Sequence, residues 1–183
     1  GWATGRSLIG GNRFYLVGPA NDPALTAQAE NMAGAYARIA GTLALFITRA
    51  DGSGTHKREM ALWRQAGIDP KGPWYIPSHD FMMASLRLAA RKKAYFMTDS
   101  STWIVGRARY GLEGLKVLRD NDPDLFNAYH ALRRAKGGGK AKLAKAFIAF
   151  LVSPAGQDII ATFGAKAYGQ PLYENAARAL KAR

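Results

Sequence analysis

Between residues 43 and 67, a short apolar run, a loop of small residues and a helical pattern follow one another. Residues 43–48 form a compact apolar run, which predicts a buried strand. The loop reads RADGSGTH, and residues 57–66 then carry apolar side chains at helical spacing up to Gly67. A buried strand that turns directly into a helix is the repeating unit of α/β folds, so this segment restricts the chain to that class.

Predicted strands and helices alternate along the rest of the chain, as an α/β fold requires. After a glycine-rich N-terminal loop, we expect strands at residues 14–17, 43–48, 94–98 and 115–118. We expect helices at residues 24–40, 57–66, 81–93, 142–151 and 154–163. The last of these begins with a Ser cap followed by Pro. Residues 126–132 fit either a strand or a loop, and three glycines at 137–139 predict a flexible connection.

The loop between the strand predicted at residues 43–48 and the helix predicted at residues 57–66 has the composition of an anion-binding site. The first N–H groups of a helix have no partner within it, and the helix dipole adds about half a positive charge there. Gly52 and Gly54 would let backbone N–H groups approach an oxyanion closely. Ser53 and Thr55 add hydroxyl donors, and Arg49 adds a charged fork. The same residues also fit a simple helix cap with Arg49 in solvent, and both interpretations stay open.

A second helix start is expected near Ser78, on the same side of the sheet. The Ser78 hydroxyl fits an anion donor, although the cap of the following helix is the commoner role for such a serine. Asp80 would oppose anion binding unless its side chain points outward.

Motifs for enzyme chemistry and for metal binding are absent from the sequence. The loop lacks the lysine of a Walker A motif, and no Gly-x-Ser-x-Gly elbow predicts a hydrolase. The chain has no cysteine, and its three histidines, at positions 56, 79 and 130, lack the spacing of metal ligands. We therefore expect no enzymatic activity, no metal site and no cofactor.

The net charge of +13 over 183 residues indicates an anionic partner. Basic residues gather at 87–93 and 133–145, but without the interleaved aromatic residues of a nucleic-acid platform, so nucleic acid is disfavoured. A small oxyanion, an acidic protein and a membrane surface stay open. No apolar run approaches the ~20 residues of a membrane-spanning helix, and no intact signal peptide is expected.

The stretch RADGSGTHK, residues 49–57, resembles the tungstate- and molybdate-binding periplasmic proteins of ABC importers, the TupA-like family. Other stretches agree with that family in the same order along nearly the whole chain. They are residues 12–14, 17–23, 61–63, 66–70, 74–75, 94–95, 98–99, 102, 125–127, 129–130, 153–154, 156–157 and 159–160. The joint pattern is far more specific than any single stretch.

The resemblance implies a type-2 periplasmic binding protein, in which two α/β lobes hold a ligand between them. Residues 18–121 would form one complete lobe, the second. Residues 1–17 and 122–183 would supply the crossing strands and the remaining part of the first lobe, which would lack its N-terminal part. The ligand would be a dehydrated tetrahedral oxyanion, tungstate or molybdate, which the sequence does not separate. The candidate ligand-binding residues are Arg49, Ser53, Gly54, Thr55 and Ser78.

The expected function is therefore binding of tungstate or molybdate and its delivery to an ABC permease, in the periplasm or outside the cell. Two departures from the family stand beside this expectation. The family's Thr/Ser-rich N-terminal loop is not in this sequence, and residues 78–82 replace its glycine-rich helix start. The alternative is a binding-protein remnant used as a basic accessory subunit of a larger assembly. Another chain would then complete the first lobe and cover its exposed sheet edges, or an acidic partner would bind the basic surface.

Overall fold

The computed structural model of the chain describes residues 1–136 and 140–181. The three glycines predicted to be flexible lie outside these ranges. The backbone divides into two compact units. We call them the central unit, Arg13–Leu125, and the flanking unit, which comprises Gly1–Asn12 and the described residues after Leu125. The lobe predicted at residues 18–121 lies within the central unit.

Five strands of the central unit follow the order β3-β2-β4-β1-β5. They are β2 (Phe46–Thr48), β3 (Tyr75–Pro77), β4 (Tyr95–Asp99), β5 (Leu115–Arg119) and the second half of β1 (Ala3–Pro19). Strand β2 is parallel to β3 and β4, whereas β1 is antiparallel to β4 and β5. Because parallel strands end at the same edge of a sheet, the loops that follow β2 and β3 meet there.

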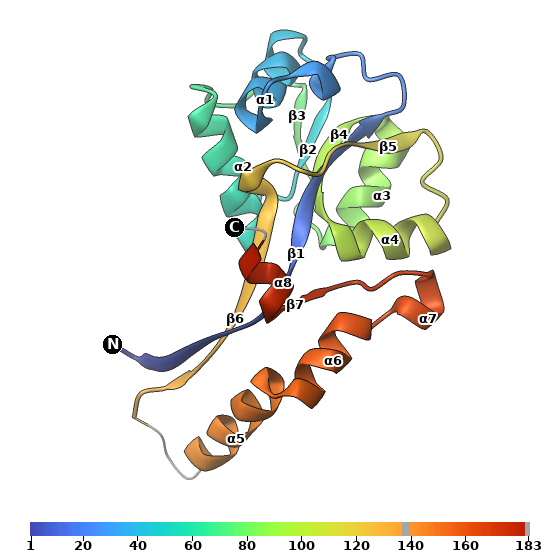
Figure 1. Cartoon of the computed structure of the whole chain (residues 1–183). Coiled ribbons are helices and arrows are strands. Elements are labelled where there is room, and N and C mark those ends of the chain that lie inside the picture. The colour runs from blue at the N-terminus through green and yellow to red at the C-terminus, as the bar shows by residue number, and fades with distance from the viewer. Residues whose placement is uncertain (137–139, 182–183) are drawn as a thin grey trace. The chain divides into compact units, whose positions relative to one another are not determined.

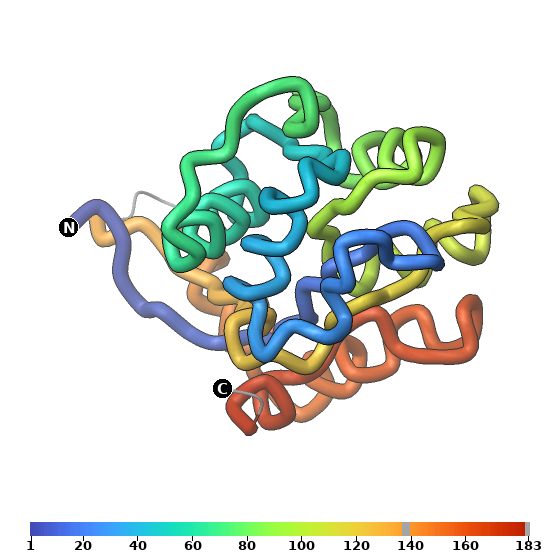
Figure 2. Tube along the Cα trace, turned by 90° about the horizontal axis from the view of Figure 1, so that it is seen from above, coloured from blue at the N-terminus to red at the C-terminus, as the bar shows by residue number. Residues whose placement is uncertain are grey.

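Helices cover both faces of this sheet (Figures 1 and 2). They are α1 (Met32–Gly41), α2 (Gly54–Gln65), α3 (Met82–Lys92) and α4 (Ser100–Arg109). Successive strand residues point to opposite faces, and the two hydrophobic cores follow that alternation. Phe46 belongs to the core that contains residues of α1 and α2, whereas its neighbour Ile47 belongs to the core with residues of α3 and α4. The predicted α/β class is therefore confirmed.

An aromatic cluster fixes α2 against the sheet. The ring of Trp63 on α2 lies 4.4 Å from that of Tyr36 and 5.2 Å from that of Phe46, both edge-on, and all three side chains are fully buried. Such pairs stabilise a core beyond the area that they bury, by about 1 kcal/mol each. The position of the first turn of α2 is therefore set by packing several residues away.

The flanking unit is built on the first half of β1, which pairs with β6 (Phe126–Arg134) and β7 (Glu174–Asn175). Its helices are α5 (Ala141–Val152), α6 (Pro154–Thr162), α7 (Ala165–Tyr168) and α8 (Ala176–Lys181). The predicted Ser cap is confirmed, because Ser153 Oγ accepts from Gly156 N at 3.3 Å. Among the described residues, no single helix is long and apolar enough to cross a membrane. Within residues 1–136 and 140–181, one pair, α5 together with Pro154–Tyr168, is long and apolar enough by length and composition alone, and it is bent by 63°.

The glycine-rich N-terminus is a strand and not the predicted loop. A Cβ atom on Gly10 would lie 2.7 Å from the carbonyl oxygen of Glu174, and one on Gly11 would lie 2.8 Å from that of Asn127. These glycines therefore permit close strand pairing, which sequence reasoning mistakes for the freedom of a loop.

The single helix predicted for residues 24–40 is also wrong, because it is interrupted. A short 3-10 turn, Thr26–Gln28, follows Leu25, whose φ is +53°, and α1 begins only at Met32. The side chain of Asn31 caps α1 by accepting from Gly34 N at 2.9 Å, a local bond that ends the preceding loop.

One predicted strand is shorter in the structure, and one ambiguous segment proves to be a strand. The predicted strand at 43–48 is shortened to β2, because Leu43 has a φ of +52° and its N–H donates to Ala40 at the end of α1. Residues 126–132, which fitted strand or loop, are the greater part of strand β6.

Candidate anion-binding site

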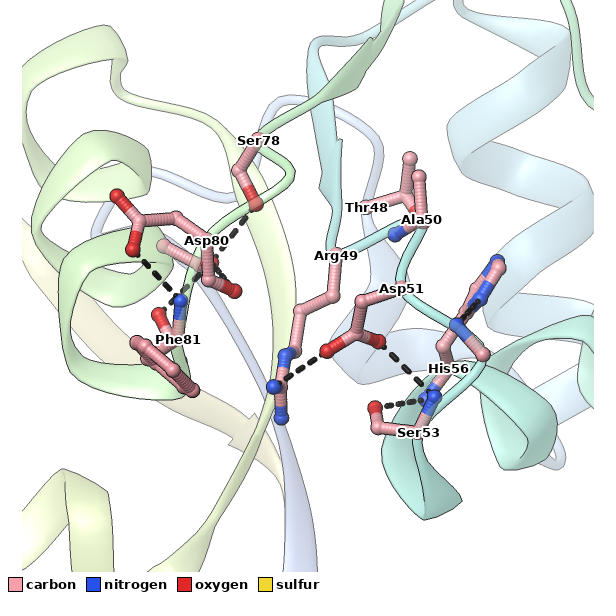
Figure 3. Close-up of polar contacts among 11 residues, drawn as sticks. Thr48, Arg49, Ala50, Asp51, Ser53, His56, Ser78, Asp80 and Phe81 are labelled. Atoms are coloured by element: carbon pink, nitrogen blue, oxygen red, sulfur yellow. Dashed lines mark hydrogen bonds and ion pairs between the residues drawn. The ribbon is translucent and has the colours of Figure 1, made fainter.

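The loop between β2 and α2 and the first two residues of α2 carry four of the five predicted site residues, and Figure 3 shows Arg49 and Ser53 of these. Strand β2 ends at Thr48, and α2 begins at Gly54 with Ser53 as its N-cap. Ser53 Oγ accepts from the N–H of His56 at 3.4 Å. The predicted cap at Ser53 is therefore present, and the Ser53 hydroxyl also hydrogen-bonds the Asp51 carboxylate.

The backbone N–H groups of this loop divide into engaged and free donors. The N–H of Gly52 donates to His56 Nδ1 at 2.9 Å, and that of Ser53 donates to Asp51 Oδ1 at 3.0 Å. Within residues 1–136 and 140–181, the N–H groups of Gly54 and Thr55 have no hydrogen-bond partner. The first two amides of α2 are therefore free to donate to an anion.

Arg49 lies in the same loop and is held by the carboxylate of Asp51. Its Nη2 atom lies 2.5 Å from Asp51 Oδ2, and only 13% of its side chain is exposed. Its Nε atom is buried and has no hydrogen-bond partner among the described residues. The guanidinium therefore retains donor capacity beyond the ion pair with Asp51.

The carboxylate of Asp51 connects Arg49 to the start of the helix. Its two oxygens contact the Ser53 N–H and the Arg49 guanidinium separately. Burial raises the pKa of Asp51, but the hydrogen bonds from Ser53 and the charge of Arg49 outweigh it and hold the pKa below its ordinary value. Asp51 is therefore a carboxylate at neutral pH.

Ser78 follows β3, and the prediction that it caps α3 is wrong. Its N–H donates to the carbonyl of Thr48 at 2.8 Å, which continues the pairing of β3 with β2. The backbone then turns at His79, whose φ is +52°, so the N-cap position of α3 falls on Phe81. The Phe81 side chain makes no capping hydrogen bond. The Ser78 hydroxyl instead pairs with that of Ser85 at 2.8 Å. Figure 3 shows the Arg49 side chain between the 78–81 segment and Asp51.

Sequence reasoning missed Glu59, a buried acid on α2. It is 1% exposed, and its Oε1 accepts from Tyr75 Oη at 2.5 Å and from Trp63 Nε1 at 3.3 Å. Burial raises its pKa to about 7, although these hydrogen bonds act in the opposite direction. The signal was its spacing, because Glu59 lies three and four residues before the apolar Leu62 and Trp63, on the buried face of the helix.

The described residues hold no cluster of three or more His, Asp or Glu side chains that could bind a metal ion. The donors gathered around the loop are instead N–H and O–H groups and one guanidinium. Such a set favours an anion that accepts hydrogen bonds and carries no protons to donate.

Three comparisons with known proteins agree on the family of this chain. A family model, the PBP superfamily domain, matches residues 1–155. The tungstate-binding protein TupA of Peptoclostridium acidaminophilum is 36% identical over an alignment of 173 residues that covers 91% of this chain and 59% of that protein.

Two solved structures are similar to this chain both in fold and in sequence. One, of the tungstate ABC transporter from Geobacter sulfurreducens, has a TM-score of 0.77 and 34% identity, covering 89% of this chain and 69% of that one. The other, the tungstate-binding protein TupA from Desulfovibrio alaskensis G20, has a TM-score of 0.76 and 35% identity, covering 95% of this chain and 71% of that one.

The chain spans between 49% and 59% of the length of the curated relatives that it matches. The superfamily match covers most of the chain. Both solved structures are more than 30% identical to this chain, which covers over two thirds of the length of each. The chain therefore belongs to the PBP superfamily, in the family that includes the tungstate-binding proteins TupA.

Proposed function

We propose that this chain is a solute-binding protein for a tetrahedral oxyanion of the tungstate and molybdate type. The observation that carries the proposal is that one short segment combines Arg49, which keeps donor capacity beyond its ion pair, with the two free N–H groups that open α2. Relatives named as tungstate-binding proteins support the same ligand class. They favour solute binding over the alternative of a basic accessory subunit.

Each candidate residue has a distinct role in the proposed site. The N–H groups of Gly54 and Thr55 donate to oxygen atoms of the anion, and Arg49 supplies the opposite charge. The hydroxyl of Ser53 turns from Asp51 to donate to the anion as well. Ser78 contributes from the adjacent strand end, since either hydroxyl of its pair with Ser85 can be the donor. A fully deprotonated oxyanion accepts from every one of these groups, and their fixed positions replace its hydration shell.

The wider function follows from the family. In this proposal the central and flanking units are parts of the two lobes of a type-2 binding protein. The bound oxyanion is delivered to an ABC permease, and the protein acts in the periplasm by binding and release without chemical change to the ligand. The relationship to a protein of a tungstate ABC transporter supports this role.

Isothermal titration calorimetry with tungstate, molybdate and sulfate tests the proposal. We expect a saturable 1:1 signal with tungstate or molybdate. Because charge-assisted hydrogen bonds contribute about 1.5–3 kcal/mol, Arg49→Ala should weaken binding by roughly 10- to 150-fold. Arg64→Ala removes the same charge from the exposed last turn of α2 and should leave binding unchanged. The absence of heat with all three anions, or equal losses in both variants, would refute the proposed site.

A further inference from the structure

Glu59 is a buried carboxyl group one turn behind the proposed anion-binding amides. It follows Thr55 by four residues, so the two side chains lie on the same face of α2, separated along the axis by about 6 Å. Three donors surround its carboxyl group: the hydroxyls of Tyr75 and Thr48 and the indole N–H of Trp63. Thr48 is also the residue directly before Arg49. Glu59 therefore contacts both the strand and the helix that position the site.

No positively charged side chain pairs with Glu59 among the described residues. Arg58, the residue directly before Glu59, pairs with Asp124 at 3.6 Å, and Arg49 of the proposed site pairs with Asp51. The three donors hold the carboxyl group in place and favour its charged form, whereas burial without a paired cation favours the neutral form.

The titratable groups around Glu59 come from four parts of the central unit. Tyr75 on β3 donates to it, Tyr36 on α1 interacts with it through its charge, and Asp51 lies in the loop after β2. His56 lies one turn earlier on α2, with its Nδ1 engaged by Gly52. The charge of Asp51 already raises the pKa of Glu59. A second negative charge bound to the same loop acts in the same direction.

We propose that binding of a dianion at the loop 49–55 is coupled to uptake of a proton by Glu59. This inference rests on the proposed function and adds its regulation: the affinity for the oxyanion falls as pH rises through neutrality. The sign follows from linkage, since a ligand that favours the protonated state of a group binds more tightly where that state is populated. If the bound dianion shifts the titration midpoint of Glu59 by about one pH unit, the dissociation constant rises about tenfold across the transition.

Calorimetry at pH 7.5 in two buffers of different ionisation enthalpy, HEPES and Tris, measures this proton directly, with sodium tungstate as the probe. We expect uptake of about half a proton per bound anion, because a midpoint moving from about 7 to about 8 changes the protonated fraction by that amount. Glu59→Gln should abolish the uptake and flatten the dependence of affinity on pH between 6.5 and 8.5. Glu113→Gln, which removes an exposed carboxylate of the same unit, should change neither.

The outcomes separate this inference from the function on which it rests. Tungstate binding without buffer dependence overturns the inference and leaves the proposed function standing. Proton uptake that persists in Glu59→Gln also overturns it and assigns the proton to another group such as His56. No binding of tungstate to the wild-type chain overturns both.

A second measurement covers the case in which Glu59→Gln does not fold. Carbon-13 NMR of the wild-type chain, with labelled glutamate, follows the Glu59 carboxyl group as pH is changed. We expect the midpoint to rise when tungstate is added, and to fall in Asp51→Asn, which removes the nearby negative charge. A midpoint that is insensitive to both changes overturns the inference.

Discussion

Ser53 and Ser153 cap two helices in the same way. Each hydroxyl oxygen accepts from the N–H three residues later, at 3.4 Å for His56 and at 3.3 Å for Gly156. The first cap ends the loop that carries Arg49, whose side chain is 13% exposed, whereas the second directly follows α5. The pair therefore distinguishes the structural role of a cap from a role in ligand binding.

We predict that Ser53→Ala and Ser153→Ala destabilise the chain similarly, by about 1 kcal/mol each, because each removes one N-cap. Only Ser53→Ala should weaken tungstate binding, by about tenfold, since it also removes a hydroxyl donor to the anion. Urea denaturation and calorimetry of both variants measure the two effects. An equal loss of affinity in both would mean that Ser53 acts through helix stability alone.

Local patterns along the chain predicted the class of fold and the position of the anion-binding loop. The strand at β2, the cap at Ser53 and the restart at Ser153 depend on residues within a few positions, where sequence patterns are informative. What sequence reasoning missed depends on partners far along the chain. The strand at Gly10 and Gly11 requires the backbones of β7 and β6, and the interruption before α1 depends on Asp22, whose carboxylate bonds Tyr95.

The candidate site shows the same division. The sequence indicated Arg49, Ser53, Gly54 and Thr55 as candidate ligand residues because they lie within one segment of seven residues. The alternative role of Ser78 as the cap of α3 is wrong, because its hydroxyl pairs with that of Ser85, seven residues later. Glu59 was missed because its burial depends on Tyr75 from a neighbouring strand.

Glu59 should make the stability of the ligand-free chain depend on pH. Its pKa rises from 4.5 to about 7 on folding, so the folded chain binds the proton more tightly than the unfolded chain. Stability is then greatest below the unfolded pKa and decreases as pH rises from 4.5 to 7, by about 3 kcal/mol. Denaturation at pH 5 and pH 8 should show this decrease in the wild type and a smaller one in Glu59→Gln. An equal decrease in both would assign it to other groups.

Asp22 should contribute stability with the opposite pH dependence. Its carboxylate accepts from Tyr95 Oη and Thr26 Oγ1, both at 2.8 Å, and from Ala27 N at 2.9 Å. Burial raises its pKa, but these bonds outweigh it and lower the pKa below 3.8. The contribution is therefore present above pH 3.8 and is lost as pH falls through the lowered pKa.

Asp22→Asn tests this contribution. It should destabilise the chain at pH 7 by about 2 kcal/mol, because the amide cannot accept all three bonds and leaves a buried donor unsatisfied. Thermal unfolding of the variant and of Asp69→Asn, a change at an exposed carboxylate, measures the effect. Matching midpoints would show that the Asp22 network adds nothing to stability.

We predict opposite effects on stability for the substitution of Gly18 and of Gly54 by alanine. A Cβ atom on Gly18 would lie 2.5 Å from Cδ1 of Tyr95, a ring that is itself fixed by Asp22, whereas a Cβ atom on Gly54 meets no atom within 4 Å. Gly18→Ala should therefore destabilise the chain by about 1–3 kcal/mol through overpacking. Gly54→Ala should keep or increase stability, because alanine favours a helix over glycine by about 1 kcal/mol. Urea denaturation of both variants compares them directly, and a tolerated Gly18→Ala would show that β4 can move away from β1.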